Sequence, residues 1–307
     1  MHTSMLPQLT AGGILVDVSP NCFGMLENSI DIVDDVDALR ARMQAEGYLY
    51  LPGYLDREEV LAARAAVAER LAAAGCLQPG TPPIEFIPRP DANMASMGDL
   101  VRGNQPLVTL LYDGRMIEFY RWFLGGEVRH FDYTWMRPVL PGRGTPPHMD
   151  IVFMGRGTTN LYTTWTPLGD IPIDMGGLMI LDRSHLHDRL NQGYGRKDVD
   201  AYCVNRREEG FAEMGGGGNI ARDGVLSRNP ARLRERLGGR WLTANFQAGD
   251  MLVFSMYTVH TSLDNHADRI RLSSDTRYQL ASEPVDERWI GEDPIAHGPD
   301  AKRGMIC

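Results

Sequence analysis

Residues 249–280, GDMLVFSMYTVHTSLDNHADRIRLSSDTRYQL, decide the fold class of this chain. The runs 251–258 and 270–280 are rich in β-branched, aliphatic and aromatic residues, and turn-forming residues separate them. This pattern predicts two buried antiparallel strands. If the hairpin is symmetric about Asn265 and His266, His260 lies opposite Arg271, and both side chains enter the same cavity.

The returning strand has two chemically different faces. Apolar residues share one face, and four polar residues share the other: Arg271, Ser273, Asp275 and Arg277. An ordinary barrel strand does not point two arginines inward, so the predicted position of His260 opposite this face favours a functional cavity. On the alternative interpretation, this polar face of an antiparallel sheet is exposed to solvent.

Shorter runs of the same composition precede this stretch, with Pro and Gly turns between them. They lie at 133–136, 160–165, 178–181 and 241–246. Helical patterns dominate the chain before residue 125. Helices followed by strands predict a mainly β fold with flanking helices, as in a sandwich or barrel with helical packing on one side.

The predicted helices carry recognisable start and stop signals. An aspartate at 34 or 35 caps a short helix that ends at Gly47, and a β run follows at 48–51. Asp56, with Glu59 three residues later, forms a capping box that opens a longer helix. A third apolar helix is expected at about 107–124.

The composition excludes several classes of protein. The chain has 307 residues, of which 43% are hydrophobic and 23% charged, which argues against wholesale disorder. Its 31 Lys and Arg against 40 Asp and Glu give a net charge of −9, which disfavours nucleic-acid binding. With no apolar run near about 18 residues and no leader pattern, we expect a cytoplasmic protein without a membrane partner. The four cysteines form no CxxC pair and are interpreted as reduced thiols.

The tripeptide His-x-Asp occurs three times, as His130/Asp132, His148/Asp150 and His266/Asp268. Residues i and i+2 of a strand share a face, so each pair could aim an imidazole and a carboxylate at one ion. The 148/150 pair lies where a Pro/Gly-rich loop enters the apolar run 151–154, which we expect to be a buried strand. The 266/268 pair lies among turn-forming residues. The 130/132 pair lies on a predicted strand and is the main alternative to the 148/150 pair as a metal-ligand pair. For any pair taken alone, the histidine and aspartate are more commonly surface residues or hydrogen-bonded polar residues of the core than metal ligands.

Two imidazoles and one carboxylate on one side of iron(II) leave three adjacent coordination positions open. An α-keto acid can occupy two of them, and dioxygen the third. The far carboxylate of a diacid then requires a fixed cation, for which a guanidinium offers a bidentate fork. Arg271 is suited to that role, with Ser273 as a neutral hydroxyl donor one strand repeat further on.

At this point the sequence resembles the phytanoyl-CoA dioxygenase family of iron(II)/2-oxoglutarate-dependent oxygenases, over about residues 37–280. The motifs that carry the resemblance are, in order, 47–53 with the Asp56 helix, 137–138 through 148–150, 165–168, 176–185, and 249–250 through His260 and Arg271. Each motif is weak alone, whereas their order and spacing together are specific. Two departures concern the substrate pocket: Asp182-Arg183-Ser184-His185 replaces the usual Pro-Gly-Ser-His, and the insertion at 189–239 is long.

The resemblance implies a set of site residues and a fold. The iron ligands would be His148, Asp150 and His260, which selects the 148/150 pair over the 130/132 pair. Arg271 and Ser273 would hold the 2-oxoglutarate side-chain carboxylate, and Trp165 would line the co-substrate pocket. The implied fold is a double-stranded β-helix, or jelly roll. Because Asp150 is present where halogenating relatives have a small residue, hydroxylation is expected.

We therefore expect a single dioxygenase domain over 1–307, with a helical buttress at 34–126, a jelly-roll core at 127–280 and an insertion or lid at 189–239. It would hydroxylate an unactivated C–H bond of a small molecule, using Fe(II), 2-oxoglutarate and O2 and forming succinate. Two alternatives are a jelly-roll hydrolase or isomerase with zinc at the same ligands, and a non-catalytic binding or sensor protein.

Several other residues allow two interpretations. The side chains of Tyr133, Arg137 and Arg277 either reach the substrate or satisfy polar groups at the barrel rim. His185 and His187 have a spacing found among metal ligands, but a hydrogen-bonding role in the turn is favoured. The four glycines at 215–218 lack the context of a phosphate-binding loop and are interpreted as a flexible linker.

Overall fold

The computed structural model describes residues 8–90, 94, 97–204 and 224–306. Its helices are α1 (Val36–Glu46), α2 (Arg57–Ala73), α3 (Met97–Val101), α4 (Gln105–Tyr112), α5 (Gly114–Leu124), α6 (Ile151–Met154), α7 (Asp188–Gln192) and α9 (Pro230–Leu237). Its strands are β1 (Thr10–Ala11), β2 (Ile14–Leu15), β3 (Phe23–Met25), β4 (Tyr48–Leu51), β5 (Val128–His130), β6 (Trp135–Val139), β7 (Tyr162–Pro167), β8 (Leu178–Leu181), β9 (Ala201–Cys203), β10 (Trp241–Thr243), β11 (Met251–Ser255), β12 (His260–Ser262), β13 (Arg271–Leu280) and β14 (Arg303–Met305).

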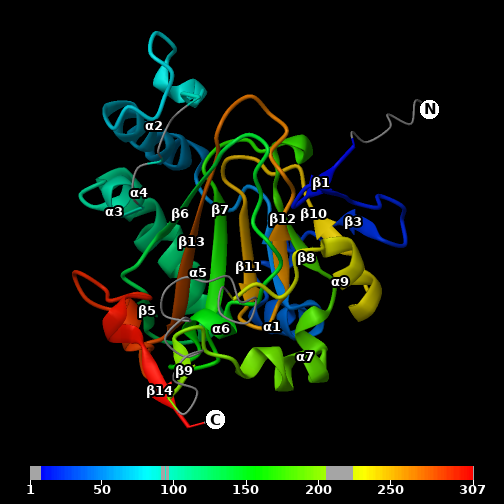
Figure 1. Ribbon diagram of the computed structural model, residues 1–307. Coiled ribbons are helices and arrows are strands. Elements are labelled where there is room, and N and C mark those ends of the chain that lie inside the picture. Colours follow the sequence, from blue (N-terminus) through cyan, green and yellow to red (C-terminus); the bar gives the residue numbers. More distant parts are fainter. Residues whose placement is uncertain (1–7, 91–93, 95–96, 205–223, 307) are drawn as a thin grey trace.

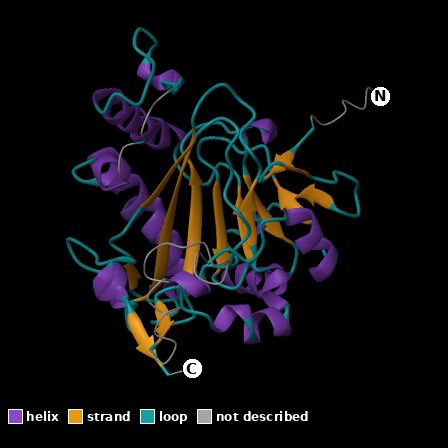
Figure 2. Cartoon of the chain, in the orientation of Figure 1, coloured by secondary structure: helices purple, strands orange, loops and turns teal. Residues whose placement is uncertain are grey.

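Two sheets form the centre of the molecule (Figures 1 and 2). The larger has the order β4-β11-β7-β13-β5, with β6 also paired to β13, and the smaller has the order β12-β8-β10-β3. Their inner faces share one apolar cluster, which includes Trp165 and Phe254 from the larger sheet and Ile180 and Leu242 from the smaller. The fold is therefore mainly β with flanking helices, as expected.

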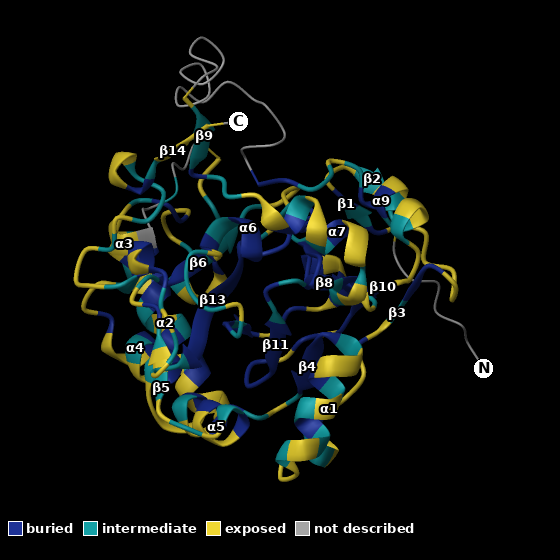
Figure 3. Cartoon of the chain, turned by 90° about the horizontal axis from the view of Figure 1, so that it is seen from below, coloured by how far each residue is buried: buried dark blue, intermediate teal, exposed yellow. Residues whose placement is uncertain are grey.

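Helices cover the outer face of the larger sheet, and their outward sides are exposed (Figure 3). Alternation along each strand explains the two-sided burial: Val253 of β11 and Leu272 of β13 pack against α2, α4 and α5, whereas their sequence neighbours face the smaller sheet. Asp35 and Asp56 cap α1 and α2 as predicted, by accepting bonds from backbone N–H groups of the first turn.

Three local expectations are wrong. The helix predicted at 107–124 is two helices, because Asp113 has an extended backbone and ends α4 while its side chain caps α5. Residues 151–154 form the short helix α6 rather than a strand. The run 251–260 is divided between β11 and β12, which belong to different sheets. In each case the local apolar pattern is real, but it does not determine where the chain turns.

The predicted hairpin that pairs His260 with Arg271 does not form. His260 pairs with Ile180 in the smaller sheet, and Arg271 pairs with Val139 in the larger one. β12 and β13 each pair with strands that are distant in the sequence. The loop between them therefore connects the two sheets and does not close a hairpin within one sheet. The two side chains nevertheless line one cavity, because the sheets face each other.

Other expectations can be compared directly with the described chain. Cys22 and Cys76 are reduced, as predicted, but Cys203 is disulfide-bonded, so the prediction of reduced thiols fails there. Asn229 caps α9 inside the predicted insertion, whereas the glycines at 215–218 lie outside the described residues. No helix in the described ranges is long and apolar enough to cross a membrane.

Candidate metal centre and active site

An isolated backbone bridge brings two histidines together that are far apart in the sequence. His148 and His260 exchange both backbone N–H to carbonyl bonds at 3.0 Å, and their ring centroids are 4.1 Å apart. Asp150 lies two residues after His148, at the start of α6. All three side chains are buried, and one ligand atom from each lies within 4.8 Å of the others.

Backbone carbonyls orient both imidazole rings. Nδ1 of His148 lies 2.9 Å from the carbonyl of Pro146, and Nδ1 of His260 lies 3.0 Å from the carbonyl of Thr258. A carbonyl can only accept, so each Nδ1 carries the proton and each Nε2 keeps its lone pair. Both Nε2 atoms lie 3.7 Å from Oδ1 of Asp150. The two lone pairs and this carboxylate oxygen converge on one point, as a metal ion requires.

The second carboxylate oxygen of Asp150 is held by protein groups. Its Oδ2 accepts hydrogen bonds from the hydroxyl of Thr163 and, at 3.0 Å, from Nη2 of Arg277. Burial by itself would raise the pKa of Asp150, but Arg277, followed by the two histidines, lowers it below its ordinary value. Burial lowers the pKa of His148 to about 3, so its imidazole is neutral. The donor set is therefore two imidazoles and one carboxylate, which fits ferrous iron.

A buried guanidinium lies in the cavity beside these ligands. Arg271 is 1% exposed, and its Nη1 donates to the hydroxyl of Ser273 at 2.6 Å. Within the described part of the chain, its Nε has no hydrogen-bond partner and no carboxylate forms an ion pair with it. Burial lowers the pKa of Arg271 to about 10. A buried cation without an anionic partner is costly, so this site fits an anionic co-substrate.

The small cavity at Arg271 is formed by both sheets. Its other lining residues are Arg137, Thr145, His148, Trp165, Leu178, His260 and Asp275. The Trp165 ring lies 5.9 Å from the guanidinium carbon of Arg271. All the residues that the sequence nominated for the site are thus close together, and the polar face of β13 points inward, as predicted from its alternation.

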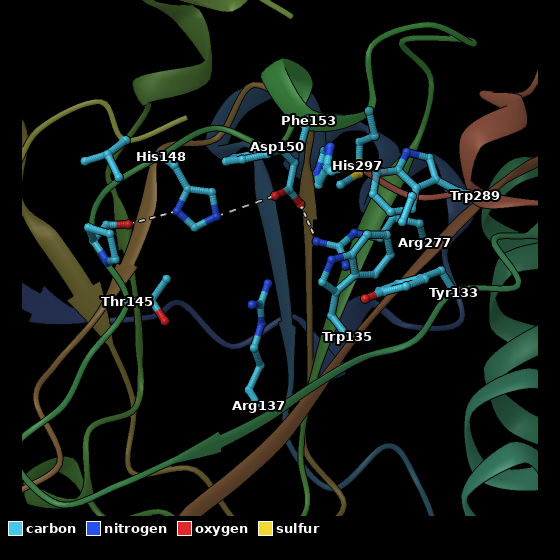
Figure 4. A pocket seen from close by; sticks show the side chains of 14 residues that line it. Tyr133, Trp135, Arg137, Thr145, His148, Asp150, Phe153, Arg277, Trp289 and His297 are labelled. Carbon is cyan, nitrogen blue, oxygen red and sulfur yellow. Dashed lines mark hydrogen bonds and ion pairs between the residues drawn. The ribbon is translucent and has the colours of Figure 1, made fainter. Parts of the chain in front are cut away.

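A larger cavity of about 400 Å³ is lined by His148 and Asp150 (Figure 4). Tyr133, Arg137 and Arg277 line it, and Arg277 also pairs with Asp150 and stacks over the ring of Trp135 at 4.0 Å. Of the two interpretations of Arg277, the ion pair with Asp150 favours the one in which it satisfies a carboxylate. The remaining lining residues are Trp135, Thr145, Pro146, Phe153, Met154, Val225, Trp289, Ala296 and His297.

Sequence reasoning missed the contribution of the C-terminal segment. Trp289 and His297 form part of the wall of the larger cavity, although the predicted core ends at residue 280. A buried ionic cluster holds this segment in place: Asp200 binds His297 Nδ1 at 2.8 Å, Arg288 Nη1 at 2.5 Å and Lys302 Nζ at 2.5 Å. No periodic pattern marks these residues, so the sequence offers no signal beyond two isolated aromatic side chains.

The competing histidines lie elsewhere and have other partners. His130 and Asp132 are 3.6 Å apart and about one third exposed, and Asp132 accepts a bond from the backbone of Gly291. His266 is on the surface. His185 Nε2 contacts the carbonyl of Gln44, which confirms its hydrogen-bonding role. The adjacent Ser184 accepts a bond from the backbone of Val259, so this turn supports the start of β12.

Known proteins resemble this chain in both sequence and structure. The sequence profile described as phytanoyl-CoA dioxygenase matches residues 43–273. The 1-deoxypentalenic acid 11-beta-hydroxylase of Streptomyces exfoliatus is 26% identical over 262 residues, which cover 82% of this chain and 83% of that protein. The enzyme of the same name from Streptomyces arenae is 28% identical over the same shares.

Two solved structures share the fold. EctD from S. alaskensis superposes with a TM-score of 0.56 at 17% identity, over 97% of this chain and 95% of its own. The epimerase SnoN from nogalamycin biosynthesis, in a complex with Fe3+ and alpha ketoglutarate, superposes with a TM-score of 0.54 at 22% identity, over 86% of this chain and 94% of its own. Because the matching profile spans most of the sequence, this chain belongs to the phytanoyl-CoA dioxygenase family, and the expected 2-oxoglutarate-dependent dioxygenase with iron, 2-oxoglutarate and O2 as cofactors is confirmed.

Proposed function

We propose that this enzyme hydroxylates an unactivated C–H bond of a small molecule and couples that oxidation to the decarboxylation of 2-oxoglutarate to succinate and CO2. One observation carries the proposal: His148 and His260, whose ligand atoms converge with that of Asp150, line one cavity with a buried guanidinium that has no carboxylate partner in the described chain. The relatives named as hydroxylases of a small carboxylic acid support the same reaction class.

Each site residue then has a specific task. His148 and His260 would bind iron through Nε2, and Asp150 through Oδ1. Arg271, assisted by the hydroxyl of Ser273, would bind the distal carboxylate of 2-oxoglutarate, and Trp165 would form one wall of that pocket. Thr163 and Arg277 keep Asp150 from rotating, because they occupy its other oxygen.

Bound iron and 2-oxoglutarate supply dioxygen activation, which no side chain provides alone. The protein contributes position and a dry environment. The two oriented imidazoles and the clamped carboxylate leave one side of the metal position facing the cavities, and the apolar wall formed by Trp135, Phe153 and Trp289 excludes water there. Asp150 occupies the position that halogenating relatives leave open for chloride, which favours hydroxylation.

We also propose a fold and a domain organisation for the chain. We assign the two facing sheets to a double-stranded β-helix and the chain to one dioxygenase domain over 1–307 in the cytoplasm. A zinc hydrolase or isomerase built on the same ligands would leave the buried charge of Arg271 without a function.

Succinate formation and oxygen consumption, measured with Fe(II) and 2-oxoglutarate, test the reaction. Asp150→Ala should reduce succinate formation by at least about 10³-fold, because it removes a ligand and leaves Arg277 without its partner. Asp132→Ala is the matched control, since Asp132 belongs to a His-x-Asp pair that lines neither cavity. Anaerobic addition of Fe(II) and 2-oxoglutarate should give a visible charge-transfer band in the wild type and in the control only. Full turnover in Asp150→Ala would refute the assignment.

A further inference from the structure

The charges around the metal position do not balance. Three buried or half-buried guanidinium groups, those of Arg137, Arg271 and Arg277, share the two cavities with only two carboxylates, Asp150 and Asp275. Arg277 pairs with Asp150 at 3.0 Å and Arg137 with Asp275 at 2.8 Å, so the charge of Arg271 is left over. A ferrous ion and a 2-oxoglutarate dianion cancel each other. The loaded site therefore keeps one positive charge in a place with little water, and this charge favours an anionic third component.

Two guanidinium groups that line the larger cavity, those of Arg137 and Arg277, have N–H donors without a partner among the described residues. The unpaired Nε and Nη1 of Arg277 are buried, whereas the side chain of Arg137 is partly exposed. The Nε of Arg137 is fixed by Asp275, and no hydrogen bond to its Nη atoms is found among the described residues. Its side chain is 32% exposed, and it lines both cavities. Figure 4 shows it projecting into the space between His148 and Arg277. Arg277, by contrast, is 2% exposed and is enclosed by Asp150 and the ring of Trp135.

The rest of the larger cavity is suited to an apolar body. Trp135, Phe153, Met154 and Trp289 line it, and its volume of about 400 Å³ lies within the usual range for a small-molecule site. Aromatic walls with one fixed cation recognise a hydrophobic ligand with a single negative group, because the cation fixes orientation while the walls provide most of the buried area.

We propose that the substrate is a hydrophobic, ring-sized monocarboxylate, whose carboxylate is bound by the two Nη atoms of Arg137. This inference rests on the proposed function and names the substrate class of the same site. A bidentate guanidinium–carboxylate pair would neutralise the remaining charge and would place the apolar body against the aromatic wall.

Ligand pairs that differ only in charge test this class. The zinc-loaded enzyme with 2-oxoglutarate does not turn over, and quenching of tryptophan fluorescence can report binding because Trp135 and Trp289 line the cavity. The probes are adamantane-1-carboxylate, adamantane-1-carboxamide and 1-adamantylmethylammonium, together with the cyclohexane and decalin analogues. We expect the carboxylates to bind at least about 10-fold more tightly than the amides, and the ammonium compounds to bind most weakly.

Substitutions at Arg137 test whether this residue causes the preference for a carboxylate ligand. Arg137→Gln should remove the preference for the carboxylate while it leaves the affinity for the carboxamide and for 2-oxoglutarate unchanged within about 3-fold, and Arg137→Lys should keep part of the preference. Arg129→Gln, an exposed arginine on β5, is the control that should change nothing. Equal binding of acids and amides by the wild type, across the panel, would overturn the proposal without any variant.

Two further outcomes separate this inference from the proposed function. A loss of 2-oxoglutarate affinity in Arg137→Gln, with the acid preference intact, would assign Arg137 to the co-substrate and overturn the substrate class alone. A wild-type protein that fails to bind 2-oxoglutarate in the zinc-loaded state would overturn the proposed function itself.

Discussion

The buried charge of Arg271 leads to the prediction that a substitution in the active site increases the free energy of unfolding. If this guanidinium serves only the co-substrate, its replacement in Arg271→Met should stabilise the metal-free protein. Burial lowers the pKa of Arg271 from its ordinary value to about 10, and that difference corresponds to roughly 3 kcal/mol for keeping the group charged. Because the pKa of Arg271 is lower in the folded state than in the unfolded state, the free-energy cost of burying the charged guanidinium is present at every pH below about 10. Methionine retains the apolar stem but leaves the hydroxyl of Ser273 without its donor. We expect a net gain of about 1 to 3 kcal/mol in the free energy of unfolding.

Urea unfolding of both proteins measures this gain. Binding of 2-oxoglutarate to the zinc-loaded wild type, at about 100 times its Kd, should add roughly 2.7 kcal/mol, whereas it should not stabilise Arg271→Met. The order of stability should therefore reverse when the co-substrate is added. Arg129→Met, at an exposed position on β5, controls for loss of an arginine as such. A variant less stable than the wild type without co-substrate, or equally stabilised by it, would refute the reasoning.

Three further predictions concern the supports of the site. Thr163→Val removes the hydroxyl that holds the ligand carboxylate, so metal affinity, measured by chelator competition, should fall about 10-fold; an unchanged affinity would count against that role. Gly47→Ala should cost about 3 kcal/mol in unfolding experiments, because the backbone φ is +77° and a Cβ would lie 2.4 Å from Nδ1 of His185. At Gly53, where φ is +66° and the space is open, alanine should cost only about 1 kcal/mol, and equal costs would exclude the steric argument. Asp200→Ala removes the carboxylate that Arg288, Lys302 and His297 share, so it should destabilise the protein by about 3 to 5 kcal/mol, and a neutral result in the same assay would show that the ionic cluster is dispensable.

Local signals predicted much of the secondary structure. The caps at Asp35 and Asp56 are found where the sequence predicts them, because a cap depends on a side chain and the next three backbone N–H groups. The turns of the chain were less predictable. The break at Asp113 divides one apolar stripe into two helices, and its cause is an extended backbone conformation that the stripe does not encode.

The site was predicted in its composition but not in its geometry. The prediction placed His260 beside Arg271 in one hairpin, whereas the two residues come from opposite sheets and meet only in the cavity between them. Both residues nevertheless line one cavity, because the two sheets face each other and the alternation of β13 places Arg271 on the inner face. The sequence did not predict that Trp289 and His297 line the larger cavity, because their position depends on how the C-terminal segment is anchored.

The amino-acid sequence alone determined which chemical groups are available: two imidazoles, one carboxylate, and a strand face that carries two guanidinium groups, a hydroxyl and a second carboxylate. Side-chain chemistry and strand alternation are local properties, so they can be taken directly from the order of residues. Only the tertiary structure decided that His148 lies beside His260 and that Oδ1 of Asp150, rather than Oδ2, faces them. Those relations depend on sheet pairing and on contacts between residues distant in the chain, which no local pattern specifies.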